Sequence, residues 1–138
     1  MIAKVVFNPR FVFTVISGWM LFHTVLFYFG AETLVSEISG LNEKGIISVK
    51  SLMEMLGGFS LFVSIVLFSC RDIEISNAKK VLTGAGFGFL CLDALMIQNE
   101  LSVAVKNPGL GTPLPAIFIW GLLTVWMLYV GLKRDSAE

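Results

Sequence analysis

The chain has too few charged residues for an ordinary soluble domain. Asp, Glu, Lys and Arg make up 14% of its 138 residues, whereas a soluble domain uses about a quarter to cover its surface. Hydrophobic residues make up 56%, and the mean hydropathy is +0.83. We infer that most of the folded surface faces hydrocarbon rather than water.

Histidine and cysteine are also scarce, with one His and two Cys in the chain. These residues are too few for a structural zinc site, and they exclude a haem held by two histidines of one chain. The net charge is zero and Lys and Arg form no long run, which argues against nucleic-acid binding. The chain contains no phosphate-binding loop, CxxC or HExxH motif. We therefore predict no catalytic residue and no metal site.

What the chain does contain is four long apolar runs, at residues 11–29, 52–70, 81–97 and 116–132. A helix needs about 20 residues, within a range of roughly 17 to 25, to cross the hydrocarbon core of a bilayer. Each run falls within that range. We predict an all-α integral membrane protein, an antiparallel four-helix bundle that forms a single domain over residues 1–138.

The basic residues predict the orientation of these spans. Seven of the ten Lys and Arg residues lie before the first span, between the second and third, or after the fourth, and only Lys44, Lys50 and Lys106 lie in the other connectors. Because cytoplasmic loops carry the excess of basic residues, both termini are expected in the cytoplasm. We expect a multi-pass protein of the bacterial inner membrane, although a photosynthetic membrane fits the same pattern.

The connector between the first two spans predicts a short helix at the membrane interface. In its sequence AETLVSEIS, Leu34, Val35 and Ile38 share one helical face and Glu32 lies elsewhere. Such an amphipathic segment suits the outer surface of a bilayer. Gly40 is the expected terminator.

Three further expectations concern single positions. Asn77 is expected to cap the start of the third helix, and Pro115 suits the first turn of the fourth. Cys70 and Cys91 lie about ten helical residues, roughly 15 Å, apart in depth, which is too far for a disulfide because the Cα atoms must approach within about 7 Å. We expect two free thiols, with Cys91 a small core residue.

Glycines punctuate the second and third spans. Gly57 and Gly58 are adjacent in the second, and Gly84, Gly86 and Gly88 alternate through the third. In lipid, small residues favour helix association because they let backbones approach closely. These glycines therefore predict helix packing, either within the bundle or against another subunit.

Ionisable side chains within the spans are the candidates for function, because they are costly in lipid. His23, Glu54 and Asp93 all fall in the outer third of the predicted bilayer, and Glu100 lies just beyond it. Asp93 shares a face with Gly86, seven positions earlier. We predict an outward-facing polar pocket. For each group the alternative is structural: hydration at the interface for Glu54, and a hydrogen bond within the bundle for Asp93 and His23.

The stretch MEMLGGFSLFVSIVLF, followed by a short basic turn and a glycine-rich third span, resembles the DoxX-like group of small bacterial four-helix membrane proteins. Members typically have a short polar motif before a Gly-Gly pair in the second span, which Glu54, Gly57 and Gly58 match. Asp93 departs from the pattern, because a basic residue is common at its position. The resemblance implies a four-helix membrane fold, and some relatives are linked to quinone-coupled oxidation of sulfur compounds.

Three functions are compatible with these features. The first is a non-catalytic accessory or scaffold subunit of a larger membrane assembly, whose partners are the bilayer, other membrane subunits or a second copy. The second is a redox helper that binds a quinone or lipid in the polar pocket. The third is an oligomeric proton- or ion-coupled transporter, in which membrane carboxylates line the path. No nucleic-acid partner is expected, and the sequence does not identify a cofactor.

Overall fold

The computed structural model describes residues 5–38, 40–105 and 113–133, and within these ranges the regular structure is helical, without strands. The elements are α2 (Pro9–Thr24), the π-helical η1 (Val25–Phe29), α3 (Ala31–Ser36), α4 (Glu43–Ser69), the 3₁₀-helical η2 (Cys70–Asp72), α5 (Ile75–Asn99), the π-helical η3 (Glu100–Ala104) and α6 (Leu114–Leu132). Within the described residues, four continuous helical segments are long and apolar enough to cross a membrane: Pro9–Phe29, Glu43–Asp72, Ile75–Ser102 and Leu114–Leu132. The all-helical class with four long apolar helices is therefore confirmed.

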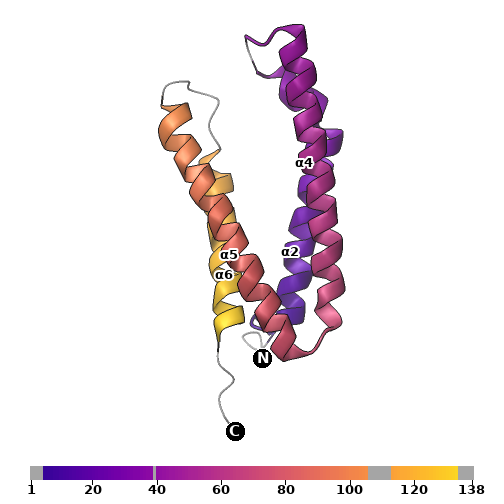
Figure 1. Ribbon diagram of the computed structural model, residues 1–138, viewed down its shortest axis with the longest axis vertical. Helices are drawn as coiled ribbons and strands as arrows, with labels where there is room; N and C mark the ends of the chain where they lie inside the picture. Colours follow the sequence, from indigo (N-terminus) through magenta and orange to yellow (C-terminus); the bar gives the residue numbers. More distant parts are fainter. Residues whose placement is uncertain (1–4, 39, 106–112, 134–138) are drawn as a thin grey trace. The chain divides into compact units, whose positions relative to one another are not determined.

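The chain divides into two compact units, which are described separately. Phe13–Ser69 forms the α2–α4 unit, and Met1–Val12 with Cys70–Glu138 forms the α5–α6 unit. The division falls inside α2. Figure 1 shows α2 beside α4 in one unit and α5 beside α6 in the other.

Local chemistry sets both ends of the first helix. Pro9 occupies the first turn, where its missing N–H has no intrahelical partner to lose, and Asn8 Oδ1 accepts the backbone N–H of Arg10 at 2.9 Å. At the other end the helix widens into η1 and stops at Gly30, whose N–H donates to the carbonyl of Leu26. A Cβ at Gly30 would collide with that carbonyl oxygen, so this position requires glycine.

The connector after η1 contains the short helix α3. Ala31 and Val35 are buried, while Glu32 is exposed and pairs with Lys50 of α4 at 3.2 Å. Gly40 follows the helix with a φ of +83°, a left-handed conformation that glycine adopts readily. An amphipathic helix is thus present between the first two spans.

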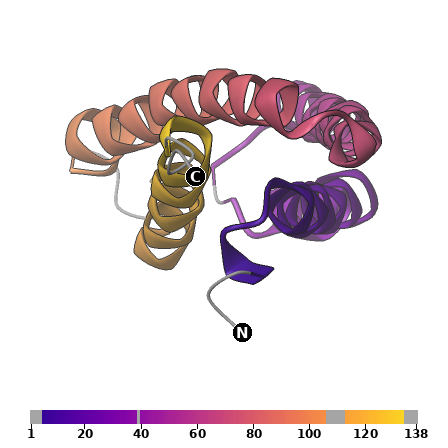
Figure 2. The ribbon, with the colours of Figure 1, turned by 90° about the horizontal axis from the view of Figure 1, so that it is seen from below.

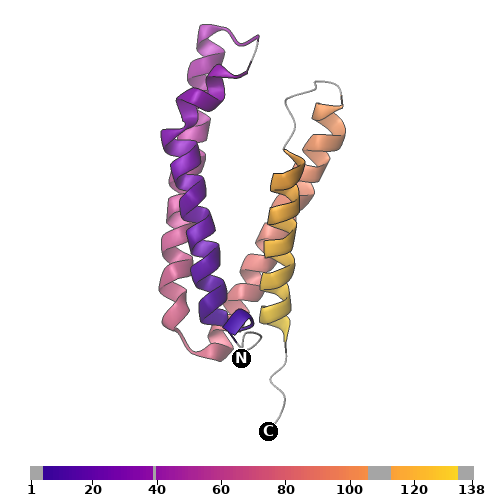
Figure 3. The same cartoon turned by 180° about the vertical axis from the view of Figure 1, so that it is seen from behind.

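Within the α2–α4 unit, the helix of α2 and η1 lies along α4 (Figure 3). Most of the buried residues of α4 are small, and the set is Gly57, Ser60, Ser64 and Leu67. A Cβ on Gly57 would lie 2.8 Å from the backbone nitrogen of Tyr28, and Ser64 Oγ donates to the carbonyl of Ser17 at 2.8 Å. Close backbone approach and an interhelical hydrogen bond therefore join these helices, as expected for packing in lipid.

Helix α5 begins earlier in the chain than the sequence predicts. α5 starts at Ile75, with Glu74 as its N-cap residue, so Asn77 lies inside the helix and its predicted capping role is wrong. Pro115 lies in the first turn of α6, as predicted. Both α4 and α5 begin before their apolar runs. Their first turns contain polar residues, so hydrophobicity alone does not reveal them.

The core of the α5–α6 unit lies between facing stripes of the two helices, and Figure 2 shows α6 (yellow) against α5 (orange), with the two helices at an angle to each other. A Cβ on Gly86 would lie 2.7 Å from the Leu128 side chain, and the Phe89 and Trp120 rings stack with centroids 5.0 Å apart. The buried stripe of α5 is Ala78, Leu82, Gly86, Phe89 and Asp93, and that of α6 is Trp120, Thr124, Met127 and Val130.

The amino-terminal segment joins α6 in the same unit. Trp126 Nε1 donates to the carbonyl of Val6 at 3.1 Å. Phe7 packs on Tyr129, with ring centroids 5.0 Å apart, and the Phe11 ring lies edge-on to Trp126. Residues far apart in the sequence thus fix the start of the chain to its last described helix.

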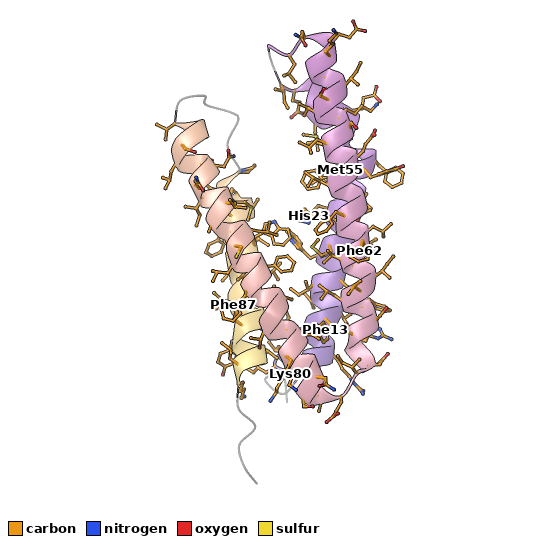
Figure 4. All side chains as sticks on the ribbon, in the orientation of Figure 1. Phe13, His23, Met55, Phe62, Lys80 and Phe87 are labelled. Atoms are coloured by element: carbon orange, nitrogen blue, oxygen red, sulfur yellow. The ribbon has the colours of Figure 1, made fainter. Side chains whose placement is uncertain are left out.

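Large apolar side chains project from every long helix. Met55 and Phe62 on α4 and Phe87 on α5 are all more than half exposed, and Figure 4 shows them extending from the ribbons. In water such surfaces would favour aggregation, whereas in hydrocarbon they cost nothing to expose. The distribution is consistent with helices that cross a membrane.

Candidate functional site

His23 lies in an aromatic cluster on α2 and η1 (Figure 4). Its ring centroid is 4.9 Å from that of Trp19 and 5.6 Å from that of Phe27, and the side chain is buried. His23 Nδ1 lies 3.1 Å from the Trp19 carbonyl oxygen. Because a carbonyl only accepts, Nδ1 carries the proton of this bond, and a neutral ring therefore has Nε2 as an acceptor.

Glu54 belongs to the same unit and lies on α4, where it is half-buried. Among the residues that the structure describes, no hydrogen bond or ion pair involves its carboxylate. The structure therefore does not bond Glu54 to His23. Hydration of Glu54 at the membrane interface, the structural alternative for this residue, stays a prediction.

Asp93 and Glu100 belong to the α5–α6 unit. Asp93 is 6% exposed and lies on the stripe that faces α6, one turn beyond Phe89. Its spacing from Gly86 places both on this buried face, as predicted. Asp93 Oδ1 and Glu100 Oε2 are buried without a hydrogen-bond partner among the described residues. An unpaired charge at Asp93 would be expensive in hydrocarbon.

The four residues of the predicted pocket are thus divided between the two units. His23 and Glu54 belong to one, and Asp93 and Glu100 belong to the other. Within each unit, none of these residues is bonded to the other predicted member. In the described part of the chain, no three His, Cys, Asp or Glu residues are grouped to hold a metal ion.

The five glycines take two different positions. Gly57 and Gly86 each touch a neighbouring helical element of their own unit, at Tyr28 and Leu128. Gly58, Gly84 and Gly88 have no heavy atom within 4 Å of the position that a Cβ would occupy.

Cys91 extends the open glycine face of α5. It is exposed, so its prediction as a core residue is wrong; Cys70 is half-buried, and both thiols are free. Positions 84, 88 and 91 follow helical spacing. Gly84, Gly88 and Cys91 therefore form one open small-residue face of α5, on the side opposite Gly86.

Sequence reasoning missed a mostly apolar groove in the α2–α4 unit. The groove has a volume of about 460 Å³ and is lined by Thr14, Ser17, Gly18, Leu21, Leu61, Ser64, Ile65, Phe68 and Ser69. Ser17 Oγ is buried without a partner among the described residues. The signal was available in the helical spacing of Thr14, Ser17 and Gly18, which gives α2 a face of small side chains.

Comparison with protein-family models, curated proteins and solved structures gave no match to this chain. The resemblance to the DoxX-like group therefore stays a prediction. The function has to be argued from the geometry of the two units.

Proposed function

We propose that this chain is a multi-pass integral membrane protein that crosses the bilayer four times and acts as a non-catalytic accessory or scaffold subunit. Its four long apolar helices and their exposed Phe, Leu and Ile side chains support the membrane assignment. The charge distribution supports cytoplasmic termini, and we assign the protein to a bacterial inner membrane.

The observation that carries the scaffold function is the open small-residue face of α5. Gly84, Gly88 and Cys91 lie on it, and the Cβ positions of the two glycines meet nothing within 4 Å. Gly86, on the opposite side of the same helix, is already used against α6. α5 thus has two surfaces on which another helix fits closely, and its own unit occupies one.

A partner helix on this face is favoured because the surrounding solvent is lipid rather than water. Lipid chains are as apolar as leucine, so helices gain nothing in lipid from hiding apolar surface, and association depends on close packing and hydrogen bonds. A glycine face open to lipid lacks side-chain atoms with which to pack against mobile chains. A helix seated there gains backbone contacts that lipid cannot reproduce, so we assign this face to a helix of another subunit or of a second copy.

Cys91 allows this proposal to be tested in the membrane. The Cys70→Ser chain retains one thiol, at the centre of the proposed interface. If the occupant is a second copy, mild oxidation of intact membranes gives a disulfide-linked dimer. If the occupant is another subunit, native nanodiscs contain the chain in a larger complex of fixed composition.

Bulky substitutions test whether the assembly depends on this face of α5. The double substitution Gly84→Ile and Gly88→Ile should abolish either assembly, because two branched side chains would hold the helices apart. Gly58→Ile is the matched control, since it introduces the same side chain at an open glycine of α4. A chain that remains a monomer in nanodiscs of its native lipids, with no crosslink at Cys91, would contradict the proposal.

A second candidate function is favoured by the groove of the α2–α4 unit. Its volume of about 460 Å³ lies in the usual range for small-molecule sites, and its mostly apolar lining suits a quinone or a lipid chain. Gly18→Phe would fill the groove. Loss of a co-purifying quinone or lipid in that variant, with retention in Gly58→Phe, would support a ligand-binding protein.

A further inference from the structure

A cationic edge marks one end of the α5–α6 unit. The Nζ atom of Lys79, in the first turns of α5, donates to the carbonyl of Lys133 just after α6, at 3.0 Å. The Lys133 ammonium lies 5.4 Å from the centre of the Phe7 ring and 6.0 Å from that of Tyr129. Lys80 is exposed, next to Lys79. The ends of two helices thus gather positive charge beside aromatic rings.

Among the described residues, Asp72 and Glu74 are acidic, lie near this edge and already have partners. Asp72 Oδ2 lies 3.4 Å from Nε of Arg71, and Glu74 Oε1 accepts a hydrogen bond from Ser76 Oγ at 3.0 Å. Neither contact involves Lys80 or Lys133.

An apolar groove of about 470 Å³ runs along α6 to this edge. It is lined by Val125, Leu128, Tyr129, Leu132 and Lys133. Only the last of these side chains is charged, and it stands at the end of the groove where α6 stops. An occupant of this groove would have an apolar body and an anionic end.

A second apolar groove adjoins the first. Its volume is about 300 Å³, and its lining is Phe7, Leu122, Val125, Trp126 and Tyr129. Val125 and Tyr129 belong to both grooves, so the two run side by side along α6. Val125 is 65% exposed and separates them without closing either.

The geometry points to a site for an anionic phospholipid, with its two acyl chains in the two grooves and its phosphate at Lys133 and Lys80. Two adjoining apolar channels with cations at one end complement the shape and charge of such a lipid. Lys or Arg near a membrane surface attracts anionic headgroups, and tyrosine favours the same interface. This site rests on the proposed membrane insertion, and it is independent of the scaffold function.

The test measures bound lipid by native mass spectrometry. The full chain is purified in detergent, delipidated, and titrated with phosphatidylglycerol or phosphatidylcholine of identical acyl chains. We expect the chain to retain phosphatidylglycerol preferentially. The double substitution Lys133→Gln and Lys80→Gln should reduce this preference by about fivefold per lysine, whereas Lys44→Gln, on α4, should leave it unchanged.

A second variant tests the grooves separately from the charge. Val125→Trp places a large ring between the two channels and should lower the binding of both lipids, while Ile119→Trp, on α6 outside either groove, should not. If only the lysine substitutions matter, or if inorganic phosphate displaces the lipid, the site binds a simple anion and the proposal is wrong. Equal retention of the two lipids by the unaltered chain would also overturn it.

Failure of the lipid site can be distinguished from failure of the membrane assignment. If the grooves hold a helix of a second copy, the unaltered chain is a dimer and Val125→Trp makes it a monomer, which overturns the lipid site. If alkaline carbonate releases the chain from membranes, the membrane assignment itself fails. Loss of lipid preference with firm membrane retention refutes the lipid site alone.

Discussion

Adding one methyl group at Gly57 or at Gly58 should have opposite effects on stability. A Cβ at Gly57 would lie 2.8 Å from the backbone nitrogen of Tyr28 and 3.0 Å from its Cβ, short of ordinary contact at 3.4 Å by about 0.6 Å. Backbone atoms cannot rotate away, so α4 and η1 must separate. Overpacking of this kind typically costs about 1–3 kcal/mol. At Gly58 the same methyl group meets nothing within 4 Å.

Gly58→Ala should instead stabilise α4, because alanine has the better helix propensity by roughly 0.5–1 kcal/mol. The two variants have the same composition and gain the same helix propensity, so their difference, about 1–3 kcal/mol, isolates the interhelical contact. The assay is reversible unfolding of the purified chain in mixed micelles, followed by helical circular dichroism and by tryptophan fluorescence. Equal stability of the two alanine variants would refute the close contact between α4 and η1.

Three further variants test other contacts. Gly30→Ala should lower the midpoint of unfolding in the same micelle titration by an amount equivalent to at least about 1 kcal/mol, because its Cβ would collide with the Leu26 carbonyl; an unchanged midpoint would show that the turn relaxes freely. Trp126→Phe removes the hydrogen bond to Val6 and should cost about 0.5–1.5 kcal/mol, with faster proteolysis of the amino-terminal segment as its signature; unchanged cleavage rates would argue against this attachment. Asp93→Leu removes a buried carboxylate whose Oδ1 has no hydrogen-bond partner among the described residues and should leave stability unchanged or raise it, since an apolar side chain carries no cost of an unsatisfied polar group; a strong loss of thermal stability in nanodiscs would mean that the carboxylate has a partner in the membrane.

The number and class of the helices could be predicted from the sequence, but their starts could not. Long apolar runs identify the parts of a helix that lie in hydrocarbon. They do not identify the more polar helical turns that precede the runs, such as those at Glu43 and Ile75, where α4 and α5 begin. Capping chemistry sets the first of these, since Asn42 Oδ1 accepts the Gly45 N–H at 2.8 Å.

The packing residues were only partly predictable for a different reason. Helical spacing placed Gly86 and Asp93 on one face, and the structure buries both. Spacing cannot say which of two adjacent glycines touches a neighbour, because Gly57 and Gly58 differ by only 100° around the helix axis. Spacing likewise puts Ser17 on a face of small residues, but it does not show that the Ser17 hydroxyl is buried.

The hydrogen bond from Trp126 to Val6 affects the order in which the protein is built. The two residues are 120 positions apart, so the segment around Val6 leaves the ribosome long before its binding surface on α6 exists. Closing so long a loop is entropically costly, and the contact forms only after α6 is in place. During synthesis the segment around Val6 therefore lacks this partner until Trp126, 120 positions later, has been made.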